Sequence, residues 1–316
     1  MDPLTHALVG AGVAGLSGGE ISITNPIVLA SMMGAVAPDL DIVYQLRGDM
    51  AYLKVHRGFS HSIPGLALIS GVIAGGLSLF FPEASLLQLF VWSFIGAISH
   101  SLLDVLNSYG AKIFAPFSNR RYTWNLLMIT DPVLLLLIFG VLLAPGNTQL
   151  KSALAILGFI LYLRIRLRLR MRVEKSLQKR FAVSKLKRIV VMPSMMGLWT
   201  WDFVVETEKK CIVGQINSFA STIKVRRKLA KTKKHCQVLQ AALNSKLGKL
   251  FKEFTPHYHL VFSEVNDTYV VDFLDLRYLL KRDFMHTGTA VFDQHLKVVE
   301  SFFQPYSKQR KIDISA

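Results

Sequence analysis

This chain of 316 residues has few cysteines and no basic residue at its start, and both absences restrict its class. The two cysteines, Cys211 and Cys236, lie in the second half of the chain. A disulfide between them is left open, but two scattered thiols fit a reducing compartment better than a secreted domain held together by disulfides. Because the start, Met-Asp-Pro-Leu-Thr-His, lacks the basic region of a signal peptide, we expect the first apolar segment to stay in the mature protein.

Charged residues are scarce in the first half and abundant in the second. Residues 1–163 contain 7 Lys+Arg and 8 Asp+Glu, a net charge of −1, whereas residues 164–316 contain 30 and 13, a net charge of +17. Hydrophobic residues make up 51% of the chain and the mean hydropathy is +0.36, which is high for a soluble protein. We therefore predict three parts: a membrane domain (1–163), a basic juxtamembrane linker (164–187) and a cytoplasmic α+β domain (188–316).

Six apolar stretches precede the basic half. They are roughly residues 4–18, 26–38, 63–81, 86–106, 126–144 and 152–164. The stretch from Ile63 to Phe81 has 19 residues without a charge, which is enough to cross a bilayer, whereas the first, second and sixth are shorter. The predicted fold class is an all-α multi-pass membrane domain of about six apolar segments, followed by a small basic α+β soluble domain.

The basic residues of the loops predict an orientation in the membrane. The loops 39–62 and 107–125 contain three basic residues each, whereas the three loops on the other side contain only Lys151 among them. Loops enriched in Lys and Arg stay in the cytoplasm. Six crossings then put both termini and both basic loops on the cytoplasmic side of a bacterial inner membrane.

Histidines and aspartates gather at the ends of the apolar stretches, all on this predicted cytoplasmic side. They are His6, Asp39, Asp41, His56, His61, His100 and Asp104. His100 and Asp104 are four residues apart and therefore project from one face of a helix whose other residues are apolar. Ionisable groups in such surroundings are costly unless they are paired or bound to an ion. Neutral imidazole with carboxylate is the ligand set of a catalytic divalent metal, so we predict that these seven residues bind metal.

Each of these residues also has a purely structural interpretation. A single histidine at a helix end is more often hydrogen-bonded than metal-bound, and Asp39 follows a proline at a helix end. Asp131, just before Pro132, either caps the fifth helix or is a further ligand. The convergence of the whole set, rather than any one member, favours the metal site.

The chemistry predicted for such a site is hydrolysis of a phosphate ester at the cytoplasmic face, with a lipid among the candidate substrates. Two or three divalent cations, with zinc favoured, would activate a water molecule for attack on a phosphoryl or acyl group. Arg57 is predicted to be a catalytic residue that holds the anionic substrate, because guanidinium recognises phosphate through paired donors. Arg120 and Arg121 are equally basic, but we favour a role as anchors on the cytoplasmic side.

Four sequence blocks resemble those of the bacterial membrane-bound metal-dependent hydrolases, the YdjM-like family. The blocks are Met-Asp-Pro-Leu-Thr-His-Ala-Leu-Val-Gly at the N-terminus, Gly-Ala-Val-Ala-Pro-Asp-Leu-Asp at 34–41, His-Arg-Gly-Phe-Ser-His-Ser at 56–62 and Ser-His-Ser-Leu-Leu-Asp-Val-Leu-Asn-Ser-Tyr-Gly at 99–110. The resemblance covers roughly residues 1–145, and the family is distantly similar to zinc-dependent phospholipase C and the single-strand nucleases. It implies that His6, Asp39 or Asp41, His56, His61, His100 and Asp104 are zinc ligands.

The basic half begins with short β-branched runs. The predicted strands are residues 188–192, 199–206 and 210–216, with a hairpin of residues 257–263 and 268–273 around Asn266-Asp267. Residues 222–254 have apolar side chains at helical spacing between lysines and are predicted to form an amphipathic helix. Residues 289–299 are expected to close the domain.

The positive charge of this half predicts a partner as well. Arginines alternate with apolar residues directly after the last apolar stretch, at Arg164, Arg166, Arg168, Arg170 and Arg172. We favour anionic headgroups of the inner leaflet as their partners over nucleic acid. Two other functions stay open: a cation-transport protein using the same His/Asp cluster, and a non-catalytic membrane regulator.

Overall fold

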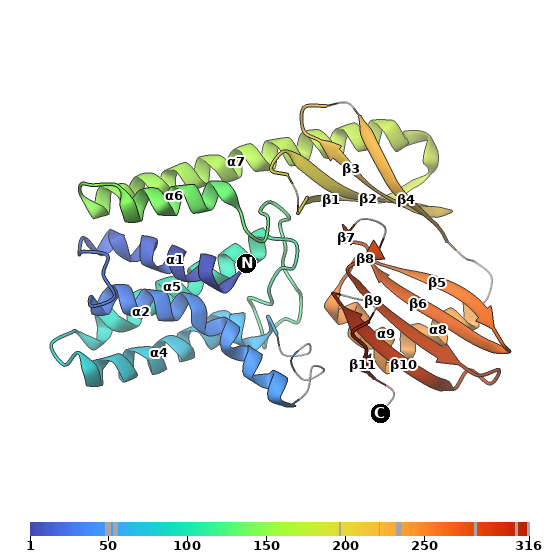
Figure 1. Ribbon diagram of the computed structural model, residues 1–316, viewed down its shortest axis with the longest axis horizontal. Helices are drawn as coiled ribbons and strands as arrows, with labels where there is room; N and C mark the ends of the chain where they lie inside the picture. The colour runs from blue at the N-terminus through green and yellow to red at the C-terminus, as the bar shows by residue number, and fades with distance from the viewer. Residues whose placement is uncertain are drawn as a thin grey trace. The chain divides into compact units, whose positions relative to one another are not determined.

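The computed structural model describes residues 1–47, 52, 56–195, 197–220, 222–231, 236–280, 283–306 and 309–314 (Figure 1). The chain forms two compact units. The N-terminal unit comprises residues 1–44 and 55–169, and the C-terminal unit comprises residues 45–54 and 170–316.

The N-terminal unit is helical. Its helices are α1 (Pro3–Ala14), α2 (Pro26–Val36), α4 (Ile63–Phe80), α5 (Leu86–Leu106), α6 (Pro132–Leu143) and the first part of α7 (Thr148–Phe181), with 3₁₀ segments η1 (Gly15–Ser17), η2 (Ala37–Arg47) and η3 (Phe59–His61). Four helices begin in the same way, with a polar side chain that caps the helix and a proline in the first turn: α1, α2, α4 and α6. The capping residues are Asp2, Asn25, Ser62 and Asp131. These caps satisfy backbone N–H groups that would otherwise lack partners at a helix start.

Within the described residues, three helices are long and apolar enough to cross a membrane. They are Pro26–Leu46 (α2 continued by η2), Ile63–Phe80 and Leu86–Leu106. Six spanning segments are therefore not supported by the described helices. Helices α1 and α6 have 12 residues each, so they extend only about 18 Å, which is less than the hydrocarbon core of a bilayer. The sixth stretch belongs to a single helix of 34 residues, α7, which continues through the arginine-rich segment.

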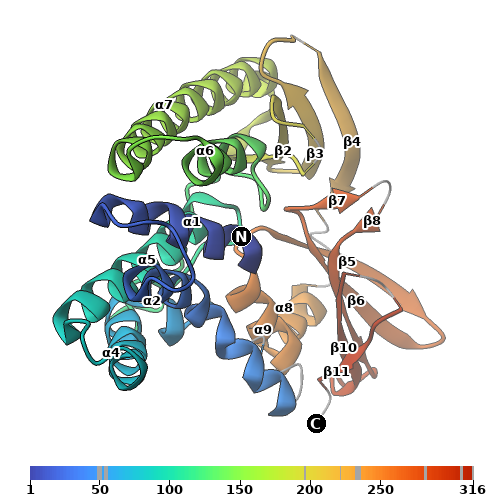
Figure 2. The same cartoon turned by 60° about the vertical axis from the view of Figure 1, so that its left-hand side comes forward.

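Small residues bring α1, α2 and α5 into close contact (Figure 2). A Cβ on Gly34 would lie 2.0 Å from the carbonyl oxygen of Ser93, and one on Gly96 would lie 2.1 Å from that of Ser31. Only glycine allows the backbones of α2 and α5 to approach this closely. The hydroxyl of Ser31 also donates to the carbonyl of Gly10 at 2.8 Å, which joins α2 to α1. Such packing is common between membrane helices, and here it gathers the helix ends that carry the candidate ligands.

In its described residues, the C-terminal unit contains two larger antiparallel sheets, a two-stranded ribbon and two short helices. The first sheet has the order β1 (Leu186–Pro193), β2 (Thr200–Thr207), β3 (Lys210–Asn217), β4 (Ile223–Ala230). The second has the order β11 (Ile312–Asp313), β10 (Val298–Pro305), β9 (His286–Phe292), β6 (Thr268–Asp275), β5 (Tyr258–Val265). The helices α8 (Cys236–Asn244) and α9 (Lys246–Phe254) pack on the second sheet, and β7 (Leu279–Leu280) and β8 (Asp283–Phe284) form a small ribbon.

The core of the second sheet is aromatic. Phe251 of α9 is fully buried, with its ring centroid 5.3 Å from that of Phe273 and 5.7 Å from that of Phe303. The hairpin predicted between β5 and β6 is confirmed, and Asn266 and Asp267 both have positive φ, as a two-residue type I′ turn requires.

The predicted helix over residues 222–254 is only partly correct, because residues 223–230 form β4. Val213 of β3 pairs with Arg227 and Gly214 pairs with Val225, so Arg226 is the extra residue of a β-bulge. A bulge interrupts the two-residue alternation of a strand. The helix prediction in this segment rested on Val225 and Leu229, which are four residues apart, but both belong to β4 and the true helices begin only at α8.

Candidate metal centre

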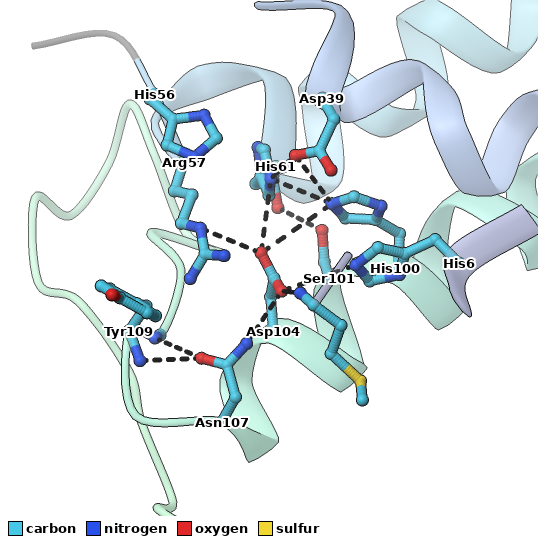
Figure 3. A network of polar contacts seen from close by, with 12 residues as sticks. His6, Asp39, His56, Arg57, His61, His100, Ser101, Asp104, Asn107 and Tyr109 are labelled. Atoms are coloured by element: carbon cyan, nitrogen blue, oxygen red, sulfur yellow. Dashed lines mark hydrogen bonds and ion pairs between the residues drawn. The ribbon is translucent and has the colours of Figure 1, made fainter. Parts of the chain in front are cut away.

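Five of the predicted ligands meet inside the N-terminal unit (Figure 3). They come from four elements: His6 from α1, Asp39 from η2, His61 from η3, and His100 with Asp104 from α5. Four of the five side chains are fully buried, and Asp39 is 17% exposed. Residues separated by almost a hundred positions in the chain thus form one buried polar cluster in an otherwise apolar helical unit.

The donor atoms of this cluster lie at separations typical of ligands that share a metal ion. The Nε2 atoms of His61 and His100 are 3.0 Å apart, and Oδ1 of Asp39 is 3.5 Å from each of them. Oδ2 of Asp104 lies 3.6 Å from the same nitrogen of His61 and 3.9 Å from that of His100. Two ligand nitrogens bound to one tetrahedral zinc ion are about 3.3 Å apart. The observed separations lie on both sides of this value, so the residues fit a zinc-sized ion.

The proton positions of His61 and His100 follow from their second nitrogens. Nδ1–H of His100 donates to the carbonyl oxygen of Ala35 at 2.7 Å, because a carbonyl can only accept. Ser60 donates its single hydroxyl proton to Asp41, so Nδ1–H of His61 donates to Ser60 at 2.9 Å. In the neutral rings both Nε2 atoms then present lone pairs to each other across 3.0 Å. A cation bound between them relieves that repulsion, and hydrogen bonds at the second nitrogen are the usual support of a metal-binding histidine.

Burial also keeps His61 in the form that binds metal. Its side chain is fully enclosed, and removal of the charged ring from water lowers its pKa to about 4, although Asp39 opposes this effect. The imidazole is therefore neutral at physiological pH, as a metal ligand must be.

His6 has unsatisfied hydrogen-bonding capacity. Neither of its ring nitrogens makes a hydrogen bond within the described residues, although the side chain is fully buried. Its ring stacks on that of His100 at 3.7 Å between centroids, and its Nε2 lies 3.6 Å from Oδ1 of Asp104. Buried polar atoms are nearly always paired. An imidazole held against a carboxylate without a hydrogen bond is accounted for by a metal ion that takes its lone pair.

Asp41 and His56 lie beside the cluster rather than in it. Nδ1 of His56 is 2.8 Å from Oδ1 of Asp41, and Oδ2 of Asp41 accepts from the backbone N–H of Arg57 and from Ser60. Both carboxylate oxygens are thus occupied by hydrogen bonds. The resemblance left Asp39 and Asp41 as alternative ligands, and this geometry favours Asp39.

Arg57 is 8% exposed and lies against the acidic end of the cluster. Its Nε is 3.2 Å from Oδ2 of Asp104 and its guanidinium lies over the ring of Tyr109 at 5.0 Å. Its Nη1 has no hydrogen-bond partner within the part of the chain that is described. The backbone of Arg57 has φ of 61°, a conformation that is costly for a residue with a side chain and is often found at functional sites.

Several neighbours of Asp104 are absent from the sequence-based predictions. Nδ2 of Asn107 donates to Oδ1 of Asp104 at 3.0 Å, and the α-amino group of Met1 contacts the same oxygen. The hydroxyl of Ser101 donates to the carbonyl of His61 at 2.9 Å, which fixes η3 against α5. The three-residue spacing from Asp104 to Asn107 is a signal that could have identified Asn107, because such residues are neighbours on a helix.

Two further charged residues of the N-terminal unit have structural positions away from the cluster. Asp131 caps α6 by accepting from the N–H groups of Val133 and Leu134, and its other oxygen accepts from the hydroxyl of Tyr162 at 2.9 Å. The capping interpretation of Asp131 is therefore correct. Arg166 is fully buried and its Nε donates to the carbonyl of Leu126 at 2.9 Å, so it differs from the exposed Arg164 and Arg168.

The apolar helices and the buried His/Asp cluster define a membrane protein with a candidate metal centre. Residues 1–173 match the family described as YdjM inner membrane protein, and the chain belongs to that family. Residues 237–313 match the YfhP C-terminal alpha/beta plait domain, which corresponds to the second sheet with α8 and α9.

Similarity to one curated protein extends over the whole chain. The uncharacterized protein YfhP of Bacillus subtilis (strain 168) is 26% identical over 333 aligned residues, which cover 100% of both chains. No solved structure matches. The resemblance to the YdjM-like family is thus confirmed, whereas the distant similarity to phospholipase C and nucleases stays a prediction.

Proposed function

We propose that this protein is a membrane-bound metal-dependent hydrolase that acts on a phosphate ester at the cytoplasmic face. The observation that carries the proposal is the pair of unprotonated Nε2 atoms of His61 and His100, 3.0 Å apart and bordered by Asp39 and Asp104. Imidazole with carboxylate favours zinc among the common divalent metals. A divalent cation held by this set would supply Lewis-acid chemistry at a phosphoryl oxygen.

The side chains around the cluster have separate roles in this proposal. Arg57 neutralises Asp104 through Nε, and its Nη1 is available to bind an anionic oxygen of the substrate. The side chain of His56 is 25% exposed and is oriented by Asp41 at 2.8 Å, so it is suited to accept or return a proton at the edge of the site. His56 therefore acts in proton transfer here rather than as a ligand.

We also propose that the cluster and the C-terminal unit face the cytoplasm, because the basic loops flank the ligand-bearing segments. Anionic lipid headgroups are the proposed partners of Arg164, Arg168, Arg170 and Arg172. A reporter fused to the C-terminus that is active only outside the cytoplasm should be silent, and activity from it would contradict this orientation.

The hydrolase proposal is tested with the full-length protein purified in detergent. Turnover of a panel of phosphomonoesters and phosphodiesters should disappear after chelation and return on addition of zinc. The variant His100→Ala should be inactive and should not regain activity with zinc, while its melting temperature stays near that of the wild type. His295→Ala, which removes an exposed histidine of the C-terminal unit, is the matched control and should behave as wild type. Full activity of His100→Ala, or zinc bound without turnover of any ester, would contradict the proposal.

A further inference from the structure

A cavity of about 470 Å³ lies in the N-terminal unit between α1, α5, α6 and α7. Its volume is within the range of cavities that bind small molecules, about 300–1,000 Å³. The wall formed by α7 extends from Ser152 to Leu163, a helix length of about 16 Å. The cavity is therefore elongated along the helices.

The lining of the cavity is almost entirely hydrocarbon. Two serines contribute to it, but the hydroxyl of Ser99 donates to the carbonyl of Gly96 and that of Ser152 donates to the carbonyl of Gly12. Neither hydroxyl proton is left for a ligand. Apolar cavities of this kind exclude water and accept apolar molecules.

The cavity runs alongside the candidate metal centre. Ser99, Leu103 and Leu106 of α5 line it, and they alternate along the same two turns with His100 and Asp104. The cavity and the cluster thus lie on adjacent faces of α5, and none of the five cluster residues lines the cavity itself.

The chemistry at the border of the cavity favours an amphiphile with an anionic head. Tyr122 lines the cavity, and the guanidinium of the exposed Arg120 lies over its ring at 5.3 Å. Leu102 and Trp124 also line it and are more than half exposed, so the cavity opens to the surroundings of the helices. For a membrane protein those surroundings are lipid, and a chain can enter from the side.

We propose that this cavity binds one hydrocarbon chain of a phosphate-bearing membrane lipid whose head group reaches the metal centre. The proposal rests on the proposed hydrolase function and specifies its substrate class. Arg120 holds the negative charge of the head group at the border, and the enclosed chain orients the lipid along α5. Because the chain enters from lipid and not from water, its recognition comes from van der Waals packing against the cavity wall and from the contact of the head group with Arg120.

The test uses vesicles of phosphatidylglycerol that carries a diazirine in the middle of one chain, with the full-length protein reconstituted into them. After irradiation, the labelled residues are mapped by mass spectrometry. We expect labelling of Leu103, Leu134 and Ile138, which line the cavity and are at most 5% exposed. Leu68 on α4, 65% exposed, reports contact with bulk lipid and should be labelled in every variant.

Gly12→Leu fills the cavity and has a matched control. A Cβ at Gly12 lies 3.9 Å from Ile138, so a longer side chain extends into the cavity, whereas a Cβ at Gly140 on α6 meets nothing within 4 Å. Gly12→Leu should reduce labelling of the cavity residues at least fivefold, and Gly140→Leu should leave it unchanged. If Gly12→Leu fails to fold, shown by a lower melting temperature, Ala155→Leu fills the same cavity from α7.

The outcomes separate this proposal from the function on which it rests. Labelling confined to Leu68, equal labelling of the cavity in Gly12→Leu, or protein–protein cross-links in place of lipid would overturn the lipid cavity. None of these readouts requires metal or turnover. Cavity labelling in a protein that binds no metal would instead overturn the hydrolase and retain the lipid-binding cavity.

Discussion

Each of the two units buries a group of ionisable side chains, and the groups differ in how completely their hydrogen bonds are made. In the C-terminal unit Asp275 and Arg277 are each 1% exposed. Arg277 donates from Nε and Nη2 to Asp275 at 2.7–3.0 Å, and Thr255 donates to the same carboxylate at 3.2 Å. Burial alone would raise the pKa of Asp275, but the guanidinium outweighs burial and holds it below its usual range.

The cluster of the N-terminal unit is as deeply buried but incompletely paired. Within the described residues, His6 has two nitrogens without a hydrogen bond, and Oδ2 of Asp104 accepts no hydrogen bond although it forms an ion pair with Nε of Arg57 at 3.2 Å. Unpaired buried polar atoms cost about 1–3 kcal/mol each, more when charged. The hydrogen bonds of Asp275 are thus made within the fold, whereas His6 in the N-terminal cluster lacks them, and this difference supports the proposal that the cluster binds a metal ion. The comparison therefore separates a structural ion pair from a binding site.

The largest effect on stability is expected from breaking the satisfied pair. Arg277→Ala leaves Asp275 buried without its partner and should lower the free energy of unfolding of the C-terminal unit by about 3–5 kcal/mol. Urea unfolding followed by the fluorescence of Trp199 and Trp201 measures this. Lys297→Ala, at an exposed site, is the control. An Arg277→Ala protein as stable as the control would show that the pair is not structural.

Acid should weaken the C-terminal unit through its buried histidines. Burial lowers the pKa of both His257 and His286 to about 4, and Arg188 adds to the shift at His257. In the unfolded chain these pKa values are about 6.5, so between pH 6.5 and 4 the unfolded state binds more protons. Stability is fully present above pH 6.5 and should fall by up to about 1.4 kcal/mol per pH unit for each histidine as the pH approaches 4. Urea unfolding at pH 7.5, 6 and 5 measures how the free energy of unfolding depends on pH. His286→Phe should make this dependence weaker. A free energy of unfolding that does not change with pH in the wild type would contradict this prediction.

Removal of a supporting hydrogen bond at the candidate metal centre should weaken metal binding without unfolding the protein. Ser60→Ala removes the hydroxyl that joins Asp41 to His61 and should raise the dissociation constant for zinc about 10–100-fold. Zinc titration with a chelating indicator measures it. Ser60→Thr keeps the hydroxyl and serves as the matched control. Equal zinc affinity of the wild type, Ser60→Ala and Ser60→Thr would show that Ser60 does not support the metal centre.

The smallest effect is expected at Asp131, an aspartate of the N-terminal unit whose hydrogen bonds are made. Asp131→Ala removes the cap of α6 and should cost about 1 kcal/mol of stability, with metal content unchanged. Asp131→Asn keeps an acceptor for the cap and should lose less. A loss of metal in Asp131→Ala would place this residue with the cluster and weaken the distinction drawn here.

Much of the site was predictable because local rules determine it. His100 and Asp104 share a helix face at any tertiary arrangement, and the Asn266-Asp267 turn follows from residues that tolerate positive φ. The pairing of Arg57 with Asp104 was not predictable, since it depends on a loop held at φ of 61°. Nor does the sequence reveal that Asp39, and not Asp41, faces the cluster.

The errors elsewhere also have physical causes. In β4, Val225 and Leu229 lie four residues apart, and this spacing favoured a helix. Hydropathy alone did not separate spanning helices from α1 and α6, which are equally apolar but too short to cross a bilayer. The burial of Arg166 was hidden among identical neighbours, because only the packing of α7 against Leu126 distinguishes it.

The central claim, that incomplete pairing marks a metal centre, is tested most directly by the metal content of paired variants. Wild-type protein, His6→Ala and His286→Phe are dialysed against the same dilute zinc solution and analysed for zinc per chain. His6 and His286 are both buried histidines, but only His6 belongs to the unsatisfied cluster. We predict at least one zinc per chain in the wild type and in His286→Phe, and a clear loss in His6→Ala. Equal zinc in all three proteins, or none in the wild type, would contradict the account.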